Sequence, residues 1–285
     1  MTASRTAQFV ALYRALETVE RRRPPLFRDP FATVFLSPGL HRAVRAARLP
    51  AVHSIVDRYA DHRAPGARTN AIGRTKLIDE VVLRAVAQGV DQVVVLGAGF
   101  DCRAHRLPEL HDRAVFEVDR AETQEAKRAR LRSVPGVRSD VHYVAVDFLR
   151  DPVPDRLAAA GWDAARPGCF IWEGVTNYLT AEAVSGMLAW IGRTAPGGSL
   201  VFTYVHKGLL DGNVAFAGGQ RIIGNVRALG EPWTFGLYPD EVGPLLERFG
   251  LSLVDDLGAD EYRARTGLAG DTGYAFYRLA VAALS

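Results

Sequence analysis

The sequence is poor in cysteine and contains no long hydrophobic run. Only Cys102 and Cys169 occur among its 285 residues, which is too few for a disulfide framework or a zinc site. Such sparse use of cysteine is typical of a reducing cytoplasm. No apolar segment approaches the roughly 20 residues that span a bilayer, and the first ten residues lack the apolar stretch of a signal peptide. We therefore expect a soluble cytoplasmic protein with no membrane association and no bound metal.

Lysine is also scarce, since three lysines stand beside 32 arginines. This bias points to a GC-rich bacterial genome. A formal net charge of +3 invites the hypothesis of a nucleic-acid partner, but the basic runs at 21–23 and 127–132 contain no interleaved aromatic residues. We interpret the first run as a helix end and the second as a solvated helix face. We expect no nucleic-acid partner.

The hydrophobic pattern changes near residue 91. Before it, apolar residues recur every three or four positions in the segments 8–22, 29–36 and 78–87, which predicts helices. After it, short apolar runs alternate with helical patterns, which predicts a parallel sheet covered by helices on both faces. We therefore expect a helical N-terminal cap over 1–90 and an α/β core over 91–285. The predicted strands are 92–96, 114–118, 142–146, 169–172, 199–205, 251–254 and 274–281.

A long segment between the fifth and sixth of these strands is rich in glycine and aromatic residues. It runs from about residue 206 to 240, which is longer than an ordinary connection in a compact domain. We expect this segment to form a lid over the carboxyl edge of the sheet.

A glycine turn follows the first predicted strand. Gly97 and Gly99 would let the backbone approach a ligand at the carboxyl end of that strand. A dinucleotide-binding turn would have a third small residue at position 102, so that a pyrophosphate could lie on the helix N-terminus. Position 102 is a cysteine, which disfavours NAD and suits a nucleoside without phosphates. The alternative is a tight turn that binds no ligand.

Acidic residues end the next three strands. Asp119 comes about twenty residues after the turn, at the separation of a carboxylate that binds a ribose diol. Asp147, followed by Phe148, could accept a hydrogen bond from an adenine amine. Glu173 follows an apolar strand, and a buried carboxylate is costly unless it meets a cation or a donor. Asp119 could instead cap a helix, but three such acids in succession predict a bound nucleoside.

Several blocks of the chain resemble a known family. LGAGFDCRAHRL at 96–107 is similar to the LGAGxDxRAxRL motif of the leucine carboxyl methyltransferase family and its bacterial O-methyltransferase relatives. Further blocks resemble the bacterial branch and follow the family's order along nearly the whole chain. They are RALE at 14–17, PLFRDPFA at 25–32, RTKLID at 74–79, EGVTNYL at 173–179 and GEPWTFGL at 230–237.

This resemblance implies a class I methyltransferase fold, with a Rossmann-like seven-stranded sheet whose last strand is antiparallel. It also implies S-adenosyl-L-methionine as the methyl donor and S-adenosyl-L-homocysteine as its product. Arg74 would pair with the carboxylate of the cofactor; the alternative is an exposed ion pair with Asp79 or Glu80. Glu173 would lie near the methionine amine or the methyl-transfer centre. The expected cofactor residues are Arg74, Gly97, Ala98, Gly99, Asp119 at the ribose, Asp147 and Phe148 at the adenine, and Glu173.

We expect in-line transfer of a methyl group from the sulfonium to an acceptor oxygen. Tyr178 would face the sulfonium, where an aromatic face favours a cation; the alternative is a core aromatic. A phenol acceptor would gain from a general base, for which His206 is the best-placed histidine, whereas a carboxylate acceptor would need none. Aromatic walls would favour a hydrophobic small molecule. The walls are expected from Tyr59, Tyr204, Trp233 and Phe235.

The bacterial branch suggests a small aromatic or polyketide-like acceptor, and hence a role in polyketide biosynthesis. The eukaryotic branch methylates the C-terminal carboxylate of a protein, which is one alternative. A second alternative is a binding module that keeps the cofactor and has lost turnover. A third is a nicotinamide-dependent oxidoreductase, against which Cys102 argues.

Overall fold

A seven-stranded sheet forms the centre of the protein, which we describe from a computed structural model over residues 5–228, 230–268 and 274–285. The strand order is β3-β2-β1-β4-β5-β7-β6. β1 to β5 pair in parallel, whereas β7 runs antiparallel to both of its neighbours. The expected fold class, including the antiparallel last strand, is confirmed. The strands are β1 Gln92–Leu96, β2 Ala114–Asp119, β3 His142–Ala145, β4 Gly168–Trp172, β5 Ser199–Val205, β6 Leu251–Gly258 and β7 Tyr277–Leu284.

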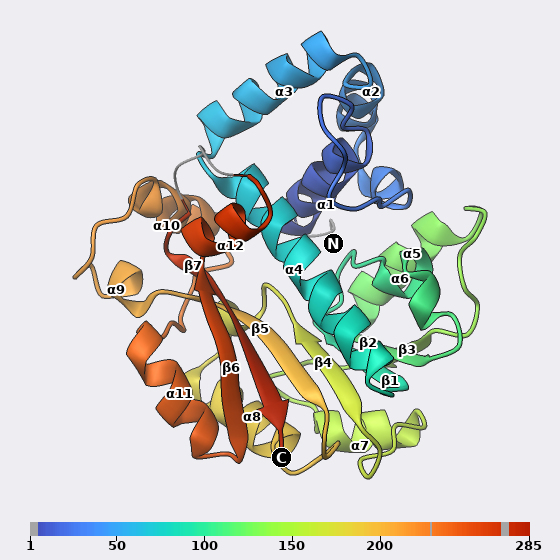
Figure 1. Cartoon of the computed structure of the whole chain (residues 1–285), viewed down its shortest axis with the longest axis vertical. Helices are drawn as coiled ribbons and strands as arrows, with labels where there is room; N and C mark the ends of the chain where they lie inside the picture. Colours follow the sequence, from blue (N-terminus) through green and yellow to red (C-terminus); the bar gives the residue numbers. More distant parts are fainter. Residues whose placement is uncertain (1–4, 229, 269–273) are drawn as a thin grey trace.

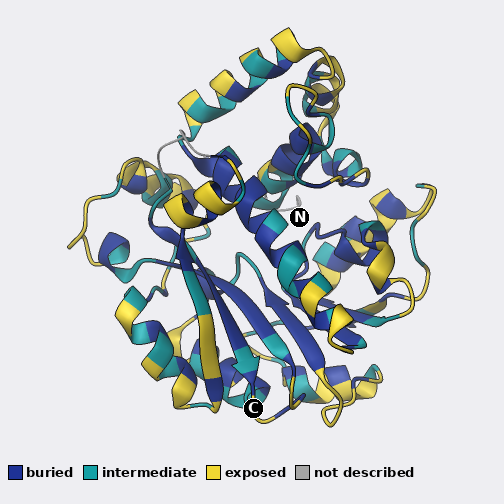
Figure 2. Ribbon diagram, viewed as in Figure 1, coloured by how far each residue is buried: buried dark blue, intermediate teal, exposed yellow. Residues whose placement is uncertain are grey.

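Alternating side chains of the strands supply two separate cores, because successive residues of a strand point to opposite faces. Val94 and Leu96 join the cluster under α7, α8 and α11, whereas Val93 and Val95 join the cluster under α4 and α12. Figure 2 shows the inner strands buried along most of their length. The helices are α4 Ala67–Ala87, α5 Arg103–Arg106, α6 Ala121–Leu131, α7 Val153–Ala159, α8 Ala181–Ile191, α11 Pro239–Glu247 and α12 Ala259–Arg265, with short 3-10 turns η2 Pro108–Leu110 and η3 Thr176–Tyr178.

The order of the strands determines where a ligand can bind. From β1 the chain goes outward to β2 and β3 on one side, and then crosses to β4 and β5 on the other side of β1. In such sheets the crevice at the carboxyl ends of the two diverging strands is the usual binding site. The glycine turn and the expected acidic residues all follow strands that end at this edge.

Four shorter elements form the N-terminal cap, which lies above the sheet in Figure 1: α1 Arg5–Thr18, η1 Ala32–Phe35, α2 Pro38–Ala46 and α3 Pro50–Arg63. The helix predicted over 8–22 ends at residue 18, and the helix predicted over 29–36 is a single 3-10 turn. The Asp29 carboxylate causes the second difference, since it accepts hydrogen bonds from the backbone N–H groups of Phe31 and Ala32 at 3.1 and 3.0 Å.

Helix α4 belongs to both parts of the molecule. Ala71 and Ile72 in its first half pack into the core of the cap, whereas Ile78 and Val82 in its second half pack onto the sheet. The boundary predicted at residue 90 therefore follows a helix that the cap and the core share. Figure 1 shows this helix running from the cap down across the face of the sheet.

The expected lid segment folds into two helices, α9 Lys207–Leu210 and α10 Gly219–Ala228. Leu209, Phe216, Ile222 and Trp233 form a small apolar cluster with Val205 at the end of β5, and with Phe276 and Tyr277 at the start of β7. The segment is thus anchored at the edge of the sheet where the site is expected. That it opens and closes as a lid stays a prediction.

The structure corrects two expectations about polar residues. Lys127 does not lie on a solvated face, because it is 1% exposed and its Nζ is 2.6 Å from the carboxylate of the equally buried Glu117. The sixth strand is longer than predicted, because its polar residues Asp255 and Asp256 interrupt the apolar pattern without ending the strand. No helix among the described residues is long and apolar enough to cross a membrane.

Candidate active site

The glycine turn lies at the carboxyl end of β1. Gly97 and Gly99 both have positive φ angles, +69° and +47°, a region that L side chains rarely adopt. The N–H groups of Gly97 and Ala98 donate to the carbonyl oxygen of Val118 at 2.7 and 3.0 Å. A Cβ atom on Gly97 would lie 2.2 Å from Cγ2 of Val175. Position 97 therefore accepts no residue except glycine without a shift of its neighbours.

Asp119 is tied to this turn. Its Oδ2 accepts a hydrogen bond from the N–H of Gly99 at 2.6 Å, and its Oδ1 accepts one from the N–H of Arg120 at 2.7 Å. Helix α6 begins at Ala121 without a side-chain cap. The capping alternative for Asp119 is therefore wrong, and the structure brings together the turn and the carboxylate that the sequence predicted at one site.

Asp147 follows β3 on the far side of β2. Its Oδ1 accepts a hydrogen bond from the N–H of Leu149 at 3.0 Å, which closes a local turn. Phe148 packs against the sheet core, whereas Leu149 is 64% exposed. The backbone N–H of Val146 donates to the carbonyl oxygen of Asp119 at 2.9 Å, so the two acidic strand ends are neighbours. The adenine contacts expected of Asp147 and Phe148 stay a prediction.

Arg74 and Glu173 form a buried ion pair between α4 and the end of β4. Nε of Arg74 lies 2.7 Å from Oε1 of Glu173, and Nη1 of Arg103 lies 3.0 Å from Oε2. Burial opposes ionisation of Glu173, but Arg103 and then Arg74 lower its pKa below the usual value. The alternative partners proposed for Arg74 are wrong, because Asp79 pairs with Arg103 and Arg106 and Glu80 pairs with Lys76.

Arg103 is the centre of a charged network that the sequence analysis did not assign. Its Nε is 2.8 Å from Oδ1 of Asp79, its backbone N–H donates to Oδ1 of Asp101 at 2.6 Å, and its guanidinium also binds Asp101. The side chain is 2% exposed. A signal was present, because these charges fall inside the family blocks at 74–79 and 96–107.

The network continues into the cap. Nη2 of Arg106 lies 2.6 Å from Asp79, and its Nε lies 3.9 Å from Oδ2 of Asp29. Oδ2 of Asp29 also lies 2.9 Å from Nε of Arg14 on α1. A continuous chain of buried charges therefore joins the cap to the carboxyl ends of β1 and β4.

Aromatic rings from three segments lie close to Arg74 or to one another. Its guanidinium carbon lies 5.0 Å from the centre of the Tyr277 ring, and the rings of Trp233 and Tyr274 each lie 6.4 Å from Tyr277. Burial raises the pKa of Tyr178, and the indole of Trp233 beside its hydroxyl opposes this shift. Tyr178 and Trp233 thus reach the same site, whereas Tyr277 and Tyr274 were missed because they lie near the C-terminus, outside the family blocks.

Three of the four expected acceptor walls need correction. Tyr59 on α3 is 66% exposed, so it forms no wall of an enclosed pocket. Tyr204 is fully buried in the core on the sheet face opposite Thr203, and its hydroxyl donates to Asp256 at 2.8 Å. Phe235 is 8% exposed and packs in the same core. That Trp233 forms a wall of the acceptor pocket stays a prediction.

His206 sits where β5 meets α9 and already has a structural role. Its Nδ1 accepts a hydrogen bond from the N–H of Gly208 at 3.1 Å, which caps α9. Its ring lies 5.1 Å from Phe216 and 5.3 Å from Tyr238. Burial lowers the pKa of His206, so the ring is neutral near pH 7. Its use as a general base stays a prediction.

Comparison with known proteins identifies the family. The sequence profile of the leucine carboxyl methyltransferase family matches residues 7–192. The chain belongs to this family. A Frankia alni protein named as an S-adenosyl-L-methionine-dependent methyltransferase is 42% identical over 197 residues, which are 68% of this chain and 65% of that protein. A Streptomyces coelicolor protein of the same description is 36% identical over 241 residues, 84% of this chain and 79% of its own length.

A solved structure agrees with this assignment. The structure of a Thermobifida fusca protein described as a methyltransferase is 19% identical in sequence, covers 97% of this chain and 94% of its own, and superposes with a TM-score of 0.58. This similarity supports the fold alone. The family expected from the sequence and the methyltransferase class are confirmed, and the leucine carboxyl methyltransferase family offers no support for the oxidoreductase alternative.

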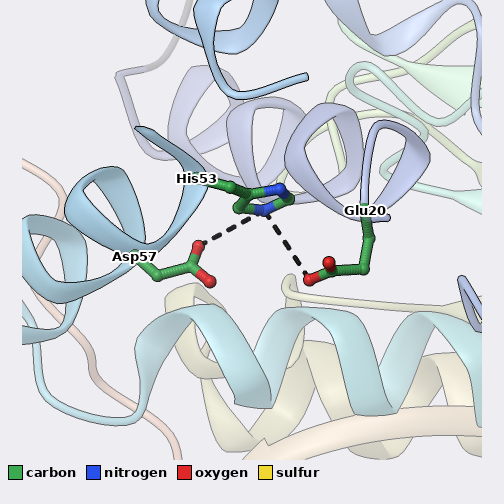
Figure 3. A group of neighbouring side chains, drawn as sticks. All are labelled: Glu20, His53 and Asp57. Carbon is green, nitrogen blue, oxygen red and sulfur yellow. Dashed lines mark ion pairs between the residues drawn. The ribbon is translucent and has the colours of Figure 1, made fainter. Parts of the chain in front are cut away.

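The cap of this family member contains a second group of buried charges, drawn in Figure 3. Nε2 of His53 points toward Glu20 and Asp57 at 3.8 and 3.6 Å. The guanidinium of Arg22 binds both carboxylates, at 2.5 and 2.6 Å. Burial opposes ionisation of Glu20, but its hydrogen bonds with Arg22 lower the pKa to about 2. Nε of Arg68 lies 3.5 Å from Asp57 and adds a second positive charge, and the cluster joins α3 to the chain after α1.

A buried histidine should make the stability of this family member depend on pH. His105 is 4% exposed, its Nδ1 accepts from the N–H of Arg138 at 3.3 Å, and burial together with Lys127 lowers its pKa to about 4. Between pH 6.5 and 4 the unfolded chain binds a proton at this position and the folded chain does not. Stability should therefore fall as the pH decreases through this window.

The prediction is tested with His105→Gln, which keeps an acceptor for Arg138 and removes the titration. Urea unfolding measures the free energy of unfolding at pH 7 and at pH 4.5. Between these two pH values it should fall by about 2 kcal/mol more in the unmodified protein than in the variant. His111→Gln, at an exposed position, is the matched control and should behave as the unmodified protein does. Equal losses in all three proteins would assign the pH dependence to other groups.

Proposed function

We propose that this family member transfers the methyl group of S-adenosyl-L-methionine to an oxygen of a small aromatic or polyketide-like acceptor. One observation carries the proposal: the glycine turn, Asp119 and the Arg74–Glu173 pair meet at the carboxyl ends of β1, β2 and β4. This is the edge at which parallel sheets bind nucleosides. The aromatic rings around Arg74 support an apolar acceptor.

The residues present fit the cofactor. The close approach of Gly97 to Val175 leaves backbone rather than side chain at the turn, which suits the stacked surface of a nucleoside. Asp119 is held beside the turn by Gly99 and offers carboxylate oxygens to a diol. Glu173 carries a negative charge next to Arg74, so the two side chains offer complementary partners for an amine and a carboxylate.

S-adenosyl-L-methionine, when bound, supplies an electrophilic methyl group on a sulfonium. The side chains of the protein then have to bind, orient and exclude water. Arg74 and Glu173 would hold the amino-acid end of the cofactor, and Tyr178, Trp233 and Tyr277 would cover the reacting end with apolar surface. Alignment of this kind can lower the activation free energy of methyl transfer by on the order of 7 to 11 kcal/mol.

The acceptor determines whether a base is needed. A carboxylate acceptor is ionised already, whereas a phenol has to lose a proton during transfer. His206 is neutral near pH 7 and its Nδ1 is engaged by Gly208, so only its Nε2 is proposed as the acceptor of that proton. Tyr178 is proposed to line the reacting centre rather than to give up its proton, because burial raises the pKa of its hydroxyl.

Calorimetric titration tests the cofactor. S-adenosyl-L-methionine, S-adenosyl-L-homocysteine and NAD are titrated into the protein in parallel. The two adenosyl compounds should bind, and NAD should give no heat. Binding of NAD alone would end the methyltransferase proposal. Binding of the adenosyl compounds without any methylated product from a broad acceptor panel would favour the alternative of a binding module.

Substitution of Asp119 tests the ribose contact. Asp119→Ala should weaken binding of S-adenosyl-L-homocysteine at least 30-fold, because a charge-assisted hydrogen-bonding partner of the diol is lost. The measurement is calorimetry, with thermal unfolding to confirm that the variant folds. Asp112→Ala, at an exposed aspartate, has the same change of charge and should bind normally. Unchanged affinity in both variants would leave Asp119 with a purely structural role at the turn.

The acceptor class is tested by product analysis. The protein is incubated with S-adenosyl-L-methionine and a panel of aromatic acids, phenols and polyketide fragments, together with a peptide that ends in a leucine carboxylate. Mass spectrometry detects a gained methyl group, and mild alkali separates esters, which hydrolyse, from ethers, which do not. Methylation of the peptide alone would favour the protein carboxyl methyltransferase alternative.

A further inference from the structure

A basic cleft opens between the cap and the lid segment. We use this name for the cavity of about 300 Å³ lined by His62 and Arg63 in the last turn of α3 and by Arg221 and Asn225 on α10. No described acidic side chain forms an ion pair with Arg63 or Arg221. Two guanidinium groups therefore line one cavity without a described counter-charge, and a cleft lined by charge of one sign attracts ligands of the opposite sign.

The cleft leads toward the candidate active site. A smaller pocket beside it is lined by Arg63 and Arg221 again, and by Pro65, Ile222 and Tyr274. Tyr274 lines only this smaller pocket, which we take as the inner end of the cleft. Its ring lies 6.4 Å from that of Tyr277, whose ring centre lies 5.0 Å from the guanidinium carbon of Arg74, so Tyr274 and Tyr277 link this pocket to the Arg74–Glu173 pair.

The backbone at the inner end is unusual. Tyr274 has a φ angle of +59°, a conformation that costs a residue with a Cβ roughly 1 to 2 kcal/mol. Strained residues of this kind occur where the surrounding structure requires a side chain in one place. Here the strain holds the tyrosine ring between the cleft and the aromatic rings of the site.

We propose that the basic cleft binds an acidic group of the methyl acceptor, a carboxylate or a phosphate, at the end of the acceptor remote from the methylated oxygen. The guanidinium forks of Arg63 and Arg221 match the oxygens of either group. Asn225 adds an amide donor and acceptor. The acceptor is thus an acidic molecule long enough to reach from the cleft past Tyr274 to the methyl group. This inference rests on the proposed function.

Direct binding tests the proposal without methyl transfer. The protein is saturated with S-adenosyl-L-homocysteine and titrated by calorimetry with 2-naphthoate, 2-naphthyl phosphate and 2-naphthamide. At least one of the two anions should bind tenfold or more tightly than the amide, and this preference should weaken in high salt. A preference for the carboxylate indicates an acidic acceptor, and a preference for the phosphate indicates a phosphorylated one.

Substitutions locate the binding. The double variant Arg63→Gln/Arg221→Gln should lose the preference for the anion, with little effect on the amide. Arg227→Gln, an exposed arginine on the same helix that does not line the cleft, should keep the preference. These side chains are exposed, so the variants should fold, and thermal unfolding confirms it.

Three results would overturn the proposal: equal binding of anions and amide, no binding of any probe, or an anion preference that survives in the double variant. Titration of S-adenosyl-L-homocysteine on the same preparations separates this failure from failure of the proposed function. Normal cofactor binding without a preference for the anions would contradict the proposed role of the cleft and leave the proposed function untouched. Loss of cofactor binding in the unmodified protein removes the proposed function.

Discussion

Replacing Arg103 with methionine is expected to lower the free energy of unfolding by at least about 3 to 5 kcal/mol, the range found when one partner of a buried ion pair is removed. The guanidinium contacts three carboxylates, on Asp79, Asp101 and Glu173. Methionine fills a similar volume but leaves these charges with fewer partners. Because whole domains are stable by about 5 to 15 kcal/mol, the variant should unfold near room temperature or fail to accumulate.

Two comparisons separate lost charge balance from general damage. Arg132→Met, at an exposed position of the chain after α6, should change the melting temperature by no more than a few degrees. Addition of Asp101→Asn and Glu173→Gln to Arg103→Met should restore part of the stability, because two of the three carboxylates then carry no charge and Asp79 keeps Arg106. Thermal unfolding followed by circular dichroism measures each variant. If Arg103→Met melts as Arg132→Met does, the network contributes little to stability.

The second large effect is expected at the glycine turn. Gly97→Ala should cost roughly 2 to 4 kcal/mol of stability, because it combines a positive φ angle with an overlap against Val175. The same variant should weaken binding of S-adenosyl-L-homocysteine at least tenfold, because either the turn or Val175 has to move. Urea unfolding and calorimetry measure the two effects.

The chain offers a matched control for this variant. Gly89 also has a positive φ angle, +96°, but a Cβ atom there would meet nothing within 4 Å. Gly89→Ala should therefore show the conformational cost alone and bind the cofactor normally. The double variant Gly97→Ala/Val175→Ala should recover the part of the loss that comes from overlap. A loss at position 97 no larger than that at position 89, with no recovery in the double variant, would rule out the overlap.

Much of the fold followed from local pattern. The first five strands are short apolar runs between helical segments, and both ends of β1 and β5 coincide with the prediction. The last two strands were placed less well. β6 is an edge strand with a bulge between Leu253 and Asp255, so its pattern does not alternate cleanly, and its acidic residues are satisfied by partners on other elements.

The site was predictable where one residue meets the backbone nearby and less so where several elements meet. Asp119 lies beside the glycine turn because adjacent parallel strands end at the same edge. Tyr204 could not be assigned, because one position along β5 decides between the two faces of the sheet. Arg63 and Arg221 are 158 positions apart in the sequence, and no local pattern shows that they face one cavity.

The shared helix α4 has a consequence for how the protein unfolds. Its first half is part of the core of the cap and its second half is part of the core of the sheet, with Arg74 between them. Neither core can melt without exposing apolar residues on the same helix. The two layers should therefore unfold in one cooperative transition, in which the Arg74–Glu173 contact is lost together with both of them.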